Sequence, residues 1–195
     1  PPEFVTGETI FYLGKSHRLR VTEGILECLA FDGTEFLLEK ENKDPFQVFR
    51  AWFIRQAEPF FNARVEWFQR RTTSVPRGIK VCDLGFRWGS CGPTGHLNFN
   101  WQLIQLPVRM IDYVVAHELT HLAVPNHSKH FWRSLGAMLP DYMERRDELA
   151  ADAHRFLRFR APPPRIRTSH PLGGHNRGEV SFSPAPSLHN HTHQP

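Results

Sequence analysis

The N-terminal part of the sequence alternates apolar and polar residues over short runs, which is the period of half-buried β-strands. The first two runs are separated by Gly14–Ser16, and a later pair is separated by Asp32 and Gly33. Short connections that contain glycine are typical of hairpins. The pattern therefore predicts four short antiparallel strands between residues 4 and 38.

The middle of the chain changes to a helical period and then returns to strands. Apolar residues recur every three or four positions from Pro45 to about Arg71, which predicts one long helix that Pro59 kinks or splits. Two strands are expected next, one over 79–88 and one within 91–104, with a turn rich in glycine and proline between them.

Three more helices are predicted between residues 107 and 159. The first spans 107–124, where a following proline stops it. The second begins after the capping residue Ser128 and ends near Met138, and the third spans 141–159. Separate groups of strands and helices in this order indicate an α+β fold.

Composition divides the 195-residue chain into three regions. Overall, 40% hydrophobic and 23% charged residues are ordinary for a globular protein. We expect an N-terminal β-strand region over 1–44 and a main core over 45–160. The segment 161–195 holds seven prolines and five histidines but few large apolar side chains, so we expect it to be a disordered tail.

Charge and cysteine content narrow the environment of the protein. The net charge of +4 permits binding to nucleic acid but does not require it. No apolar run approaches 18 residues, so no membrane span is expected. Cys28, Cys82 and Cys91 form no CxxC pair, which argues against a zinc ribbon or a disulfide framework and favours the cytoplasm. Cys91 has no evident base partner and is not expected to be a nucleophile.

His117, Glu118 and His121 spell the pattern HExxH within the apolar helix 107–124. Residues four apart lie on one helix face, so both imidazoles can reach a single metal ion. Zinc suits neutral nitrogen ligands with one open position, and Glu118 is placed to act as a general base. We therefore expect a zinc site here. The alternative is a set of hydrogen-bonded polar groups in the core.

A third ligand is expected from the turn that follows this helix. His127 lies in that turn, where the chain can fold back toward the ion, and it is the expected ligand. His130 in the next helix is its nearest rival. A carboxylate from Glu144, Asp147 or Glu148 remains a more distant alternative.

The segment before the helix is expected to bind substrate. Trp88 and Gly89 lie in a turn, and the strand after it places Asn98 and Asn100 on one face and Phe99 on the other. If this strand lies at the edge of the sheet, its backbone can pair with an extended peptide. The alternative is an ordinary structural strand.

Several separate blocks of the sequence resemble the YgjP-like metallopeptidase family. In chain order these blocks are FYLGKSHRLRV, RWGSCGPTGHLNFNWQLIQLP, IDYVVAHELTHLAVPNHSKHFW and the PDY motif that begins at Pro140. The resemblance covers about Phe4 to Phe159 and implies a zincin-like metallopeptidase core over 45–160.

The family is in turn similar to SprT-like and WLM zinc peptidases, in which a histidine before the second helix completes the metal site. Carried over to this sequence, the resemblance implies His127 as third ligand beside His117 and His121, with Glu118 as base. Pro125 departs from the charged or polar residues of relatives at this place and is expected to shift the ligand turn only slightly.

The leading hypothesis is a zinc-dependent metallopeptidase that acts on a peptide or protein substrate. A second hypothesis is a protease that acts on proteins attached to DNA, motivated by the mild basic charge and by the SprT-like and WLM similarity. A third is a non-catalytic module that binds zinc and peptide. Its zinc would be closed by a fourth protein ligand, as in structural sites.

Overall fold

The computed structural model describes residues 2–159 of the chain. The tail expected over 161–195 lies outside the described residues. Four strands open the fold: β1 (Thr9–Tyr12), β2 (Lys15–Thr22), β3 (Leu29–Phe31) and β4 (Glu35–Glu39). After them come α1 (Pro45–Gln69), β5 (Gly78–Cys82), β6 (Gly89–Cys91), β7 (His96–Asn100), the 3-10 helix η1 (Trp101–Gln105), α2 (Val108–His121), α3 (Lys129–Met138) and α4 (Tyr142–Phe156). The α+β class is confirmed.

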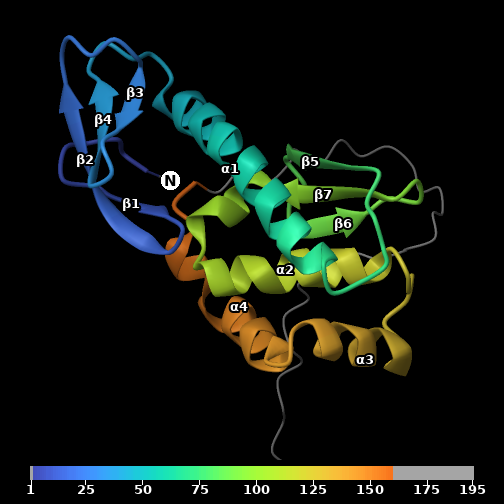
Figure 1. The fold of residues 1–195 in the computed structure, drawn as a ribbon. Helices are drawn as coiled ribbons and strands as arrows, with labels where there is room; N and C mark the ends of the chain where they lie inside the picture. The colour runs from blue at the N-terminus through green and yellow to red at the C-terminus, as the bar shows by residue number, and fades with distance from the viewer. Residues whose placement is uncertain (1, 160–195) are drawn as a thin grey trace, which may run out of the picture.

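The N-terminal sheet has the strand order β1-β2-β4-β3 (Figure 1). Both predicted hairpins are present, because β1 pairs antiparallel with β2 and β3 pairs antiparallel with β4. The expectation that all four strands run antiparallel is wrong for one pair, since β2 and β4 are parallel. The reason is that β3 takes the outer position, and the turn at Gly33 then returns β4 between β3 and β2.

Helix α1 begins where the sequence provides a cap and a proline. The side chain of Asp44 accepts a hydrogen bond from the backbone N–H of Gln47 at 3.1 Å, and Pro45 occupies the first turn. Pro59 does not split the helix, which is continuous over its 25 residues. Pro59 is exposed, so the interruption it causes to the backbone hydrogen bonds faces away from the core.

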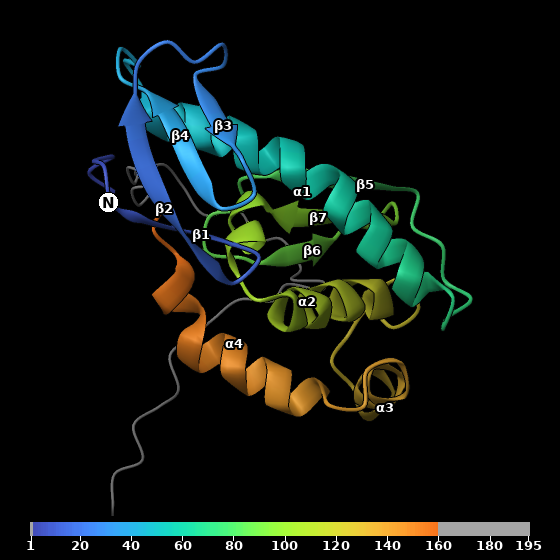
Figure 2. The same ribbon diagram turned by 60° about the vertical axis from the view of Figure 1, so that its left-hand side comes forward.

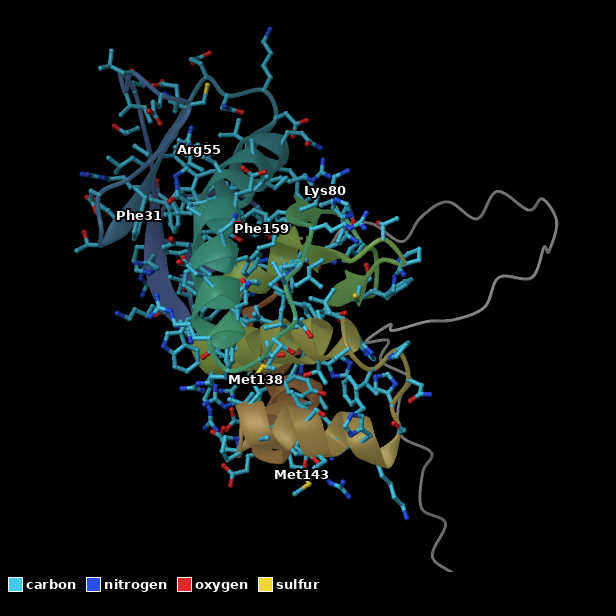
Figure 3. The ribbon with its side chains drawn as sticks, turned by 45° about the vertical axis from the view of Figure 1, so that its right-hand side comes forward. Phe31, Arg55, Lys80, Met138, Met143 and Phe159 are labelled. Carbon is cyan, nitrogen blue, oxygen red and sulfur yellow. The ribbon has the colours of Figure 1, made fainter. Side chains whose placement is uncertain are left out.

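Aromatic side chains join α1 to the N-terminal sheet in one core. Phe159, at the end of the described chain, is fully buried beside α1, with its ring 5.0 Å from that of Phe49 and 5.3 Å from that of Phe53 (Figure 3). Trp52 and Phe36 pack edge to face at 5.0 Å in the same cluster. The C-terminal end of the described chain thus helps to fix the N-terminal sheet.

The second sheet has the strand order β5-β7-β6. Strand β7 is central: it pairs parallel with β5 and antiparallel with β6. The strand carrying Asn98, Phe99 and Asn100 therefore does not form the sheet edge, which was the condition for its pairing with an extended peptide. Strand β6 is the edge strand on the side of α2, and the two are in contact (Figure 2).

Helix α2 is buried along almost its whole length. The sheet covers one side of α2, and α3 and α4 cover the other (Figures 1 and 2). Two acidic residues of the helix are enclosed as well, since Asp112 is 7% exposed and Glu118 is fully buried. Burial of charged groups is costly unless they are paired. None of the helices within residues 2–159 is both long and apolar enough to cross a membrane.

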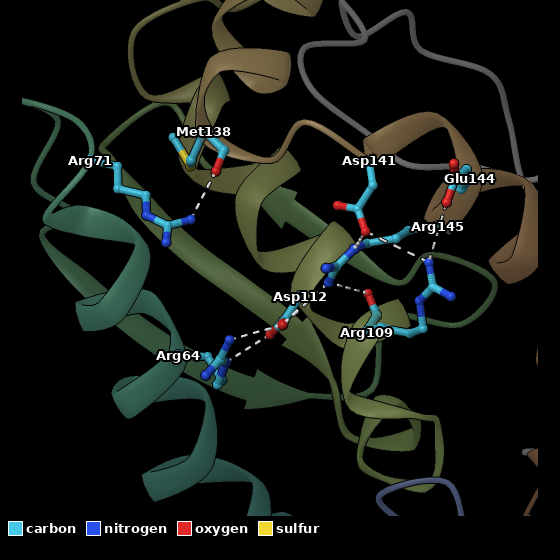
Figure 4. A network of polar contacts seen from close by, with 8 residues as sticks. All are labelled: Arg64, Arg71, Arg109, Asp112, Met138, Asp141, Glu144 and Arg145. Carbon is cyan, nitrogen blue, oxygen red and sulfur yellow. Dashed lines mark hydrogen bonds and ion pairs between the residues drawn. The ribbon is translucent and has the colours of Figure 1, made fainter.

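Asp112 is paired with arginines from two other helices (Figure 4). Arg64 of α1 donates Nε–H and Nη2–H to the two carboxylate oxygens at 2.7 and 2.9 Å. Arg145 of α4 donates to the same carboxylate at 3.4 Å and to the backbone carbonyl of Arg109 at 3.2 Å. This network ties α1 and α4 to the helix that carries HExxH.

Replacing Asp112 with Ala should destabilise the fold by about 2–3 kcal/mol, because two partly buried guanidinium groups lose their acceptor. The free energy of unfolding in urea measures this loss. Glu23→Ala is the matched control, since within residues 2–159 Glu23 pairs with Lys40 alone and both side chains are well exposed. Equal unfolding midpoints for Asp112→Ala and the parent would contradict the proposed role of the network.

Candidate metal centre

Three imidazoles converge at the C-terminal end of α2. His117 and His121 come from two consecutive turns of α2, and His127 comes from the bend before α3. The Nε2 atoms of His117 and His121 lie 3.1 Å apart. That of His127 lies 3.1 Å from the His121 atom and 3.0 Å from the His117 atom. The structure therefore brings together the three histidines that the sequence singled out.

Hydrogen bonds cannot account for this triangle of nitrogen atoms. In a neutral imidazole each Nε2 either carries a proton or accepts one. Three mutual contacts therefore include at least one between two donors or two acceptors, which is repulsive. A single cation that receives all three lone pairs removes the conflict. Zn–N distances of about 2.0–2.1 Å place tetrahedral nitrogen ligands about 3.3 Å apart, close to the separations observed.

Burial keeps all three rings neutral, as a metal ligand requires. It lowers the pKa of His117 well below the ordinary value, and the neighbouring His121 and His127 add to the effect. The pKa of His121 falls to about 4, mainly by burial, against the opposing effect of the hydrogen bond that His121 donates to the carbonyl of Val124. Burial also lowers the pKa of His127. At neutral pH the lone pairs are available to a metal ion.

The second ring nitrogens of His121 and His117 also have partners, and the partner of His121 fixes the tautomer of that ring. Nδ1 of His121 lies 3.0 Å from the carbonyl oxygen of Val124, which can only accept, so Nδ1 carries the proton and Nε2 keeps its lone pair. Nδ1 of His117 lies 3.4 Å from the hydroxyl of Tyr113. Such outer partners orient metal-binding histidines. The Val124–Pro125 turn therefore supplies an acceptor to the site.

Aromatic rings from α3 and α4 hold His127 in place. The imidazole of His127 stacks on Trp132, with ring centres 5.6 Å apart and planes 23° apart. Trp132 stacks in turn on Tyr142 at 5.7 Å and 18°. Phe131 lies against all three histidines, with ring centres 4.5–4.9 Å away. The PDY motif thus reaches the site through Tyr142, a contact that sequence reasoning missed.

The rival ligands lie away from this cluster. His130 is exposed and does not belong to the group of converging donor atoms. Glu148 pairs with Arg109 at 2.6 Å and Glu144 pairs with the same residue at 3.8 Å. Asp147 pairs with its neighbour in α4. Among the described residues, three histidines form the one group of donors close enough to hold an ion.

Glu118 faces the edge strand β6 at a point where only glycine fits. A Cβ atom added to Gly89 would stand 2.7 Å from Cγ and from Oε1 of Glu118. The backbone of β6 therefore passes directly against this buried carboxylate. Sequence reasoning placed Gly89 near the substrate but missed this contact, whose one signal was a glycine in a strand-like run.

The other expected substrate residues are buried or hydrogen-bonded within the fold. Asn100 is buried and donates its amide N–H groups to the backbone carbonyls of Gly85 and Arg87 at 3.2 and 2.9 Å. Phe99 is fully buried and Trp88 is 8% exposed. Asn98 donates to the hydroxyl of Ser90 at 3.2 Å. The premise for pairing Asn98–Asn100 with a peptide is removed, since β7 is enclosed between two strands.

Cys91, on β6, is held as a thiol. Burial raises its pKa to about 11, with a further contribution from the charge of Glu118. A thiol with so high a pKa is a weak nucleophile at neutral pH. The expectation that Cys91 is not a nucleophile agrees with this environment.

An HExxH helix whose two histidines meet a third imidazole from the next turn defines a metallopeptidase of the HExxH class. A family described as YgjP-like, metallopeptidase domain, matches residues 1–152 of the chain. The chain belongs to the YgjP-like metallopeptidase family.

It is also similar to the crystal structure of the metallopeptidase zymogen of Pyrococcus abyssi abylysin. That similarity has 19% identity, a TM-score of 0.42, and covers 46% of this chain and 90% of that one. A search of curated proteins found no match.

Replacing Trp132 with Leu should weaken metal binding about tenfold or more, because the stacked support of His127 is lost while all three imidazoles remain. Competition with a chromophoric chelator measures the affinity. Trp67→Leu is the control, because Trp67 is a half-exposed tryptophan of α1 outside the site. Equal affinities for Trp132→Leu and the parent would show that the stack does not position His127.

Replacing Gly89 with Ala should lower peptide hydrolysis about a hundredfold, because the new methyl group displaces the carboxylate of Glu118. Metal content should stay near that of the parent. Gly78→Ala, on β5, is the control, since its methyl group meets only the exposed ring of His96. Full hydrolysis by Gly89→Ala would disprove the steric constraint.

Proposed function

We propose that this protein is a zinc-dependent peptidase in which Glu118 acts as the general base. The observation that carries the proposal is the convergence of three neutral imidazole nitrogens, 3.0–3.1 Å apart, next to a buried carboxylate. His117, His121 and His127 would hold the ion. Zinc favours nitrogen ligands of this kind in tetrahedral geometry.

The number of donors supports a catalytic site over a structural one. Structural zinc is almost always closed by four protein ligands, whereas catalytic zinc has three and an open position. Within residues 2–159 the cluster offers three donor side chains. When bound, the ion supplies a Lewis acid that polarises a carbonyl and lowers the pKa of water from about 15.7 toward neutrality.

Glu118 performs the proton transfers in the proposed reaction. Its carboxylate takes a proton from the attacking water as the water oxygen bonds to the peptide carbonyl carbon. Glu118 then gives this proton to the peptide nitrogen as the C–N bond breaks. Its position against the backbone at Gly89 fixes the carboxylate on the side of β6, where substrate would lie.

The edge of β6 is the proposed binding surface for the peptide backbone. Among the described strands, β6 has a hydrogen-bonded neighbour only on its β7 side. Its other edge faces the HExxH side of the molecule, where β6 contacts α2. An extended peptide can add to such an edge through main-chain hydrogen bonds. This assigns to β6 the role that the sequence had suggested for the strand of Asn98–Asn100.

Replacing Glu118 with Gln should keep the metal content and reduce kcat/KM for a fluorogenic peptide about 10²–10⁴-fold, because the base is lost while the three histidines remain. The matched control is Glu144→Gln, since Glu144 is exposed on α4 and its carboxylate is 3.8 Å from Arg109. Cleavage by Glu118→Gln at the rate of the parent would disprove the mechanism.

A further inference from the structure

A cavity of about 160 Å³ opens directly beside His121. Its walls come from two elements: the hairpin that joins β6 to β7, and the end of α2 with the turn after it. Besides His121, the residues that line it are Cys91, Gly92, Pro93, Gly95, Leu122 and Pro125. One water needs only about 10–15 Å³, so the cavity has room for a side chain.

The lining offers no polar side chain that is free to bind an occupant. No charged residue contributes to it. His121 already uses both of its ring nitrogens, because Nδ1 bonds to the carbonyl of Val124 and Nε2 faces the other two histidines. Cys91 stays a neutral thiol and behaves as a small apolar group. Polar and apolar atoms contribute about equally to the lining, but none of its side chains is charged. An uncharged, mainly apolar side chain is therefore the occupant that this lining accepts.

Hydrogen bonds within the chain fix the hairpin that forms one wall of the cavity. The N–H of Gly92 donates to the carbonyl of His96 at 2.8 Å, and the N–H of Gly95 donates to the carbonyl of Gly92 at 2.9 Å. Gly95 has a φ of +81°, which L side chains rarely adopt. A Cβ atom at Gly95 would make ordinary contacts with Cγ of Arg77 at 3.7 Å and Cδ2 of Leu122 at 3.9 Å, so the backbone conformation is what favours glycine here.

The cavity lies close to the position of the bond to be cleaved. Gly89 touches Glu118, and Cys91 lines the cavity two residues farther along the same strand. Two residues of a strand span about 6–7 Å. A peptide paired with β6 would therefore send into the cavity the side chain of a residue that flanks the scissile bond.

We infer that this cavity is a specificity pocket for a medium-sized apolar side chain, such as Leu, Met or Val, next to the cleaved bond. The inference rests on the proposed peptidase function and adds its substrate class: peptides with such a residue at the cleavage site. Leu122 is the largest apolar side chain of the lining, so its size should limit the side chain that is accepted. One methylene group more or less on a substrate side chain in a hydrophobic pocket typically changes kcat/KM by about 10–200-fold.

The test is digestion of a peptide library by the zinc-loaded full chain, followed by kcat/KM for matched peptides that differ only at the flanking residue. The parent should prefer Leu, Met or Val over Ala and over charged residues. Leu122→Trp should lower kcat/KM for the Leu peptide about tenfold or more relative to the Ala peptide. Leu122→Ala should shift the preference toward Phe. Leu26→Trp, at a fully exposed position of the N-terminal region, should keep the preference of the parent.

The outcomes separate this inference from the proposed function. If the parent shows no cleavage that depends on Glu118, both are wrong. If the parent cleaves without an apolar preference, or if Leu122→Trp keeps the preference of the parent, the pocket inference alone is overturned. Zinc stoichiometry and thermal unfolding verify that each variant is folded. Should Leu122→Trp fail to bind zinc, Cys91→Val narrows the cavity from the strand side, and its effect on the Leu-to-Ala ratio decides the question.

Discussion

The repulsion among three converging imidazole nitrogens is the constraint on which the rest of the structure depends. His117, His121 and His127 place their Nε2 atoms within 3.1 Å of one another, an arrangement that neutral rings cannot satisfy by hydrogen bonding alone. The fold has to hold these rings together by packing until a cation receives their lone pairs. The surroundings of the site serve this purpose: Phe131 fills the space beneath the rings, and Trp132 backs the exposed His127.

Burial of α2 keeps its histidines neutral. It also carries a free-energy cost for the acidic residues of the same helix. The same desolvation that keeps the histidines neutral would destabilise ionised carboxylates on this helix. Asp112 is compensated by arginines from α1 and α4. Glu118 instead lies against β6, where the proposed reaction takes place. Asp112 and Glu118 thus lie six positions apart on different faces of α2. The first belongs to the scaffold, and the second is the proposed general base.

The sequence was sufficient where the signal is local and insufficient where it depends on pairing between distant segments. The i, i+4 spacing in HExxH and the turn position of His127 follow from helix geometry, and the structure brings these rings together. The central position of β7 and the parallel pairing of β2 with β4 depend on which strand lies beside which, and periodicity does not encode this. The contacts of Tyr142 with Trp132 and of Gly89 with Glu118 were missed for the same reason, because each depends on how two separate elements pack against each other.

The central claim is that one zinc ion is held by three imidazoles with one position open. Zinc-edge anomalous diffraction from crystals of the metal-loaded full chain tests it most directly. The account predicts one anomalous peak per chain, about 2.0–2.1 Å from the Nε2 atoms of His117, His121 and His127, with no fourth protein ligand. A chain that purifies and reconstitutes without stoichiometric metal, or a peak closed by a fourth side chain, would contradict it.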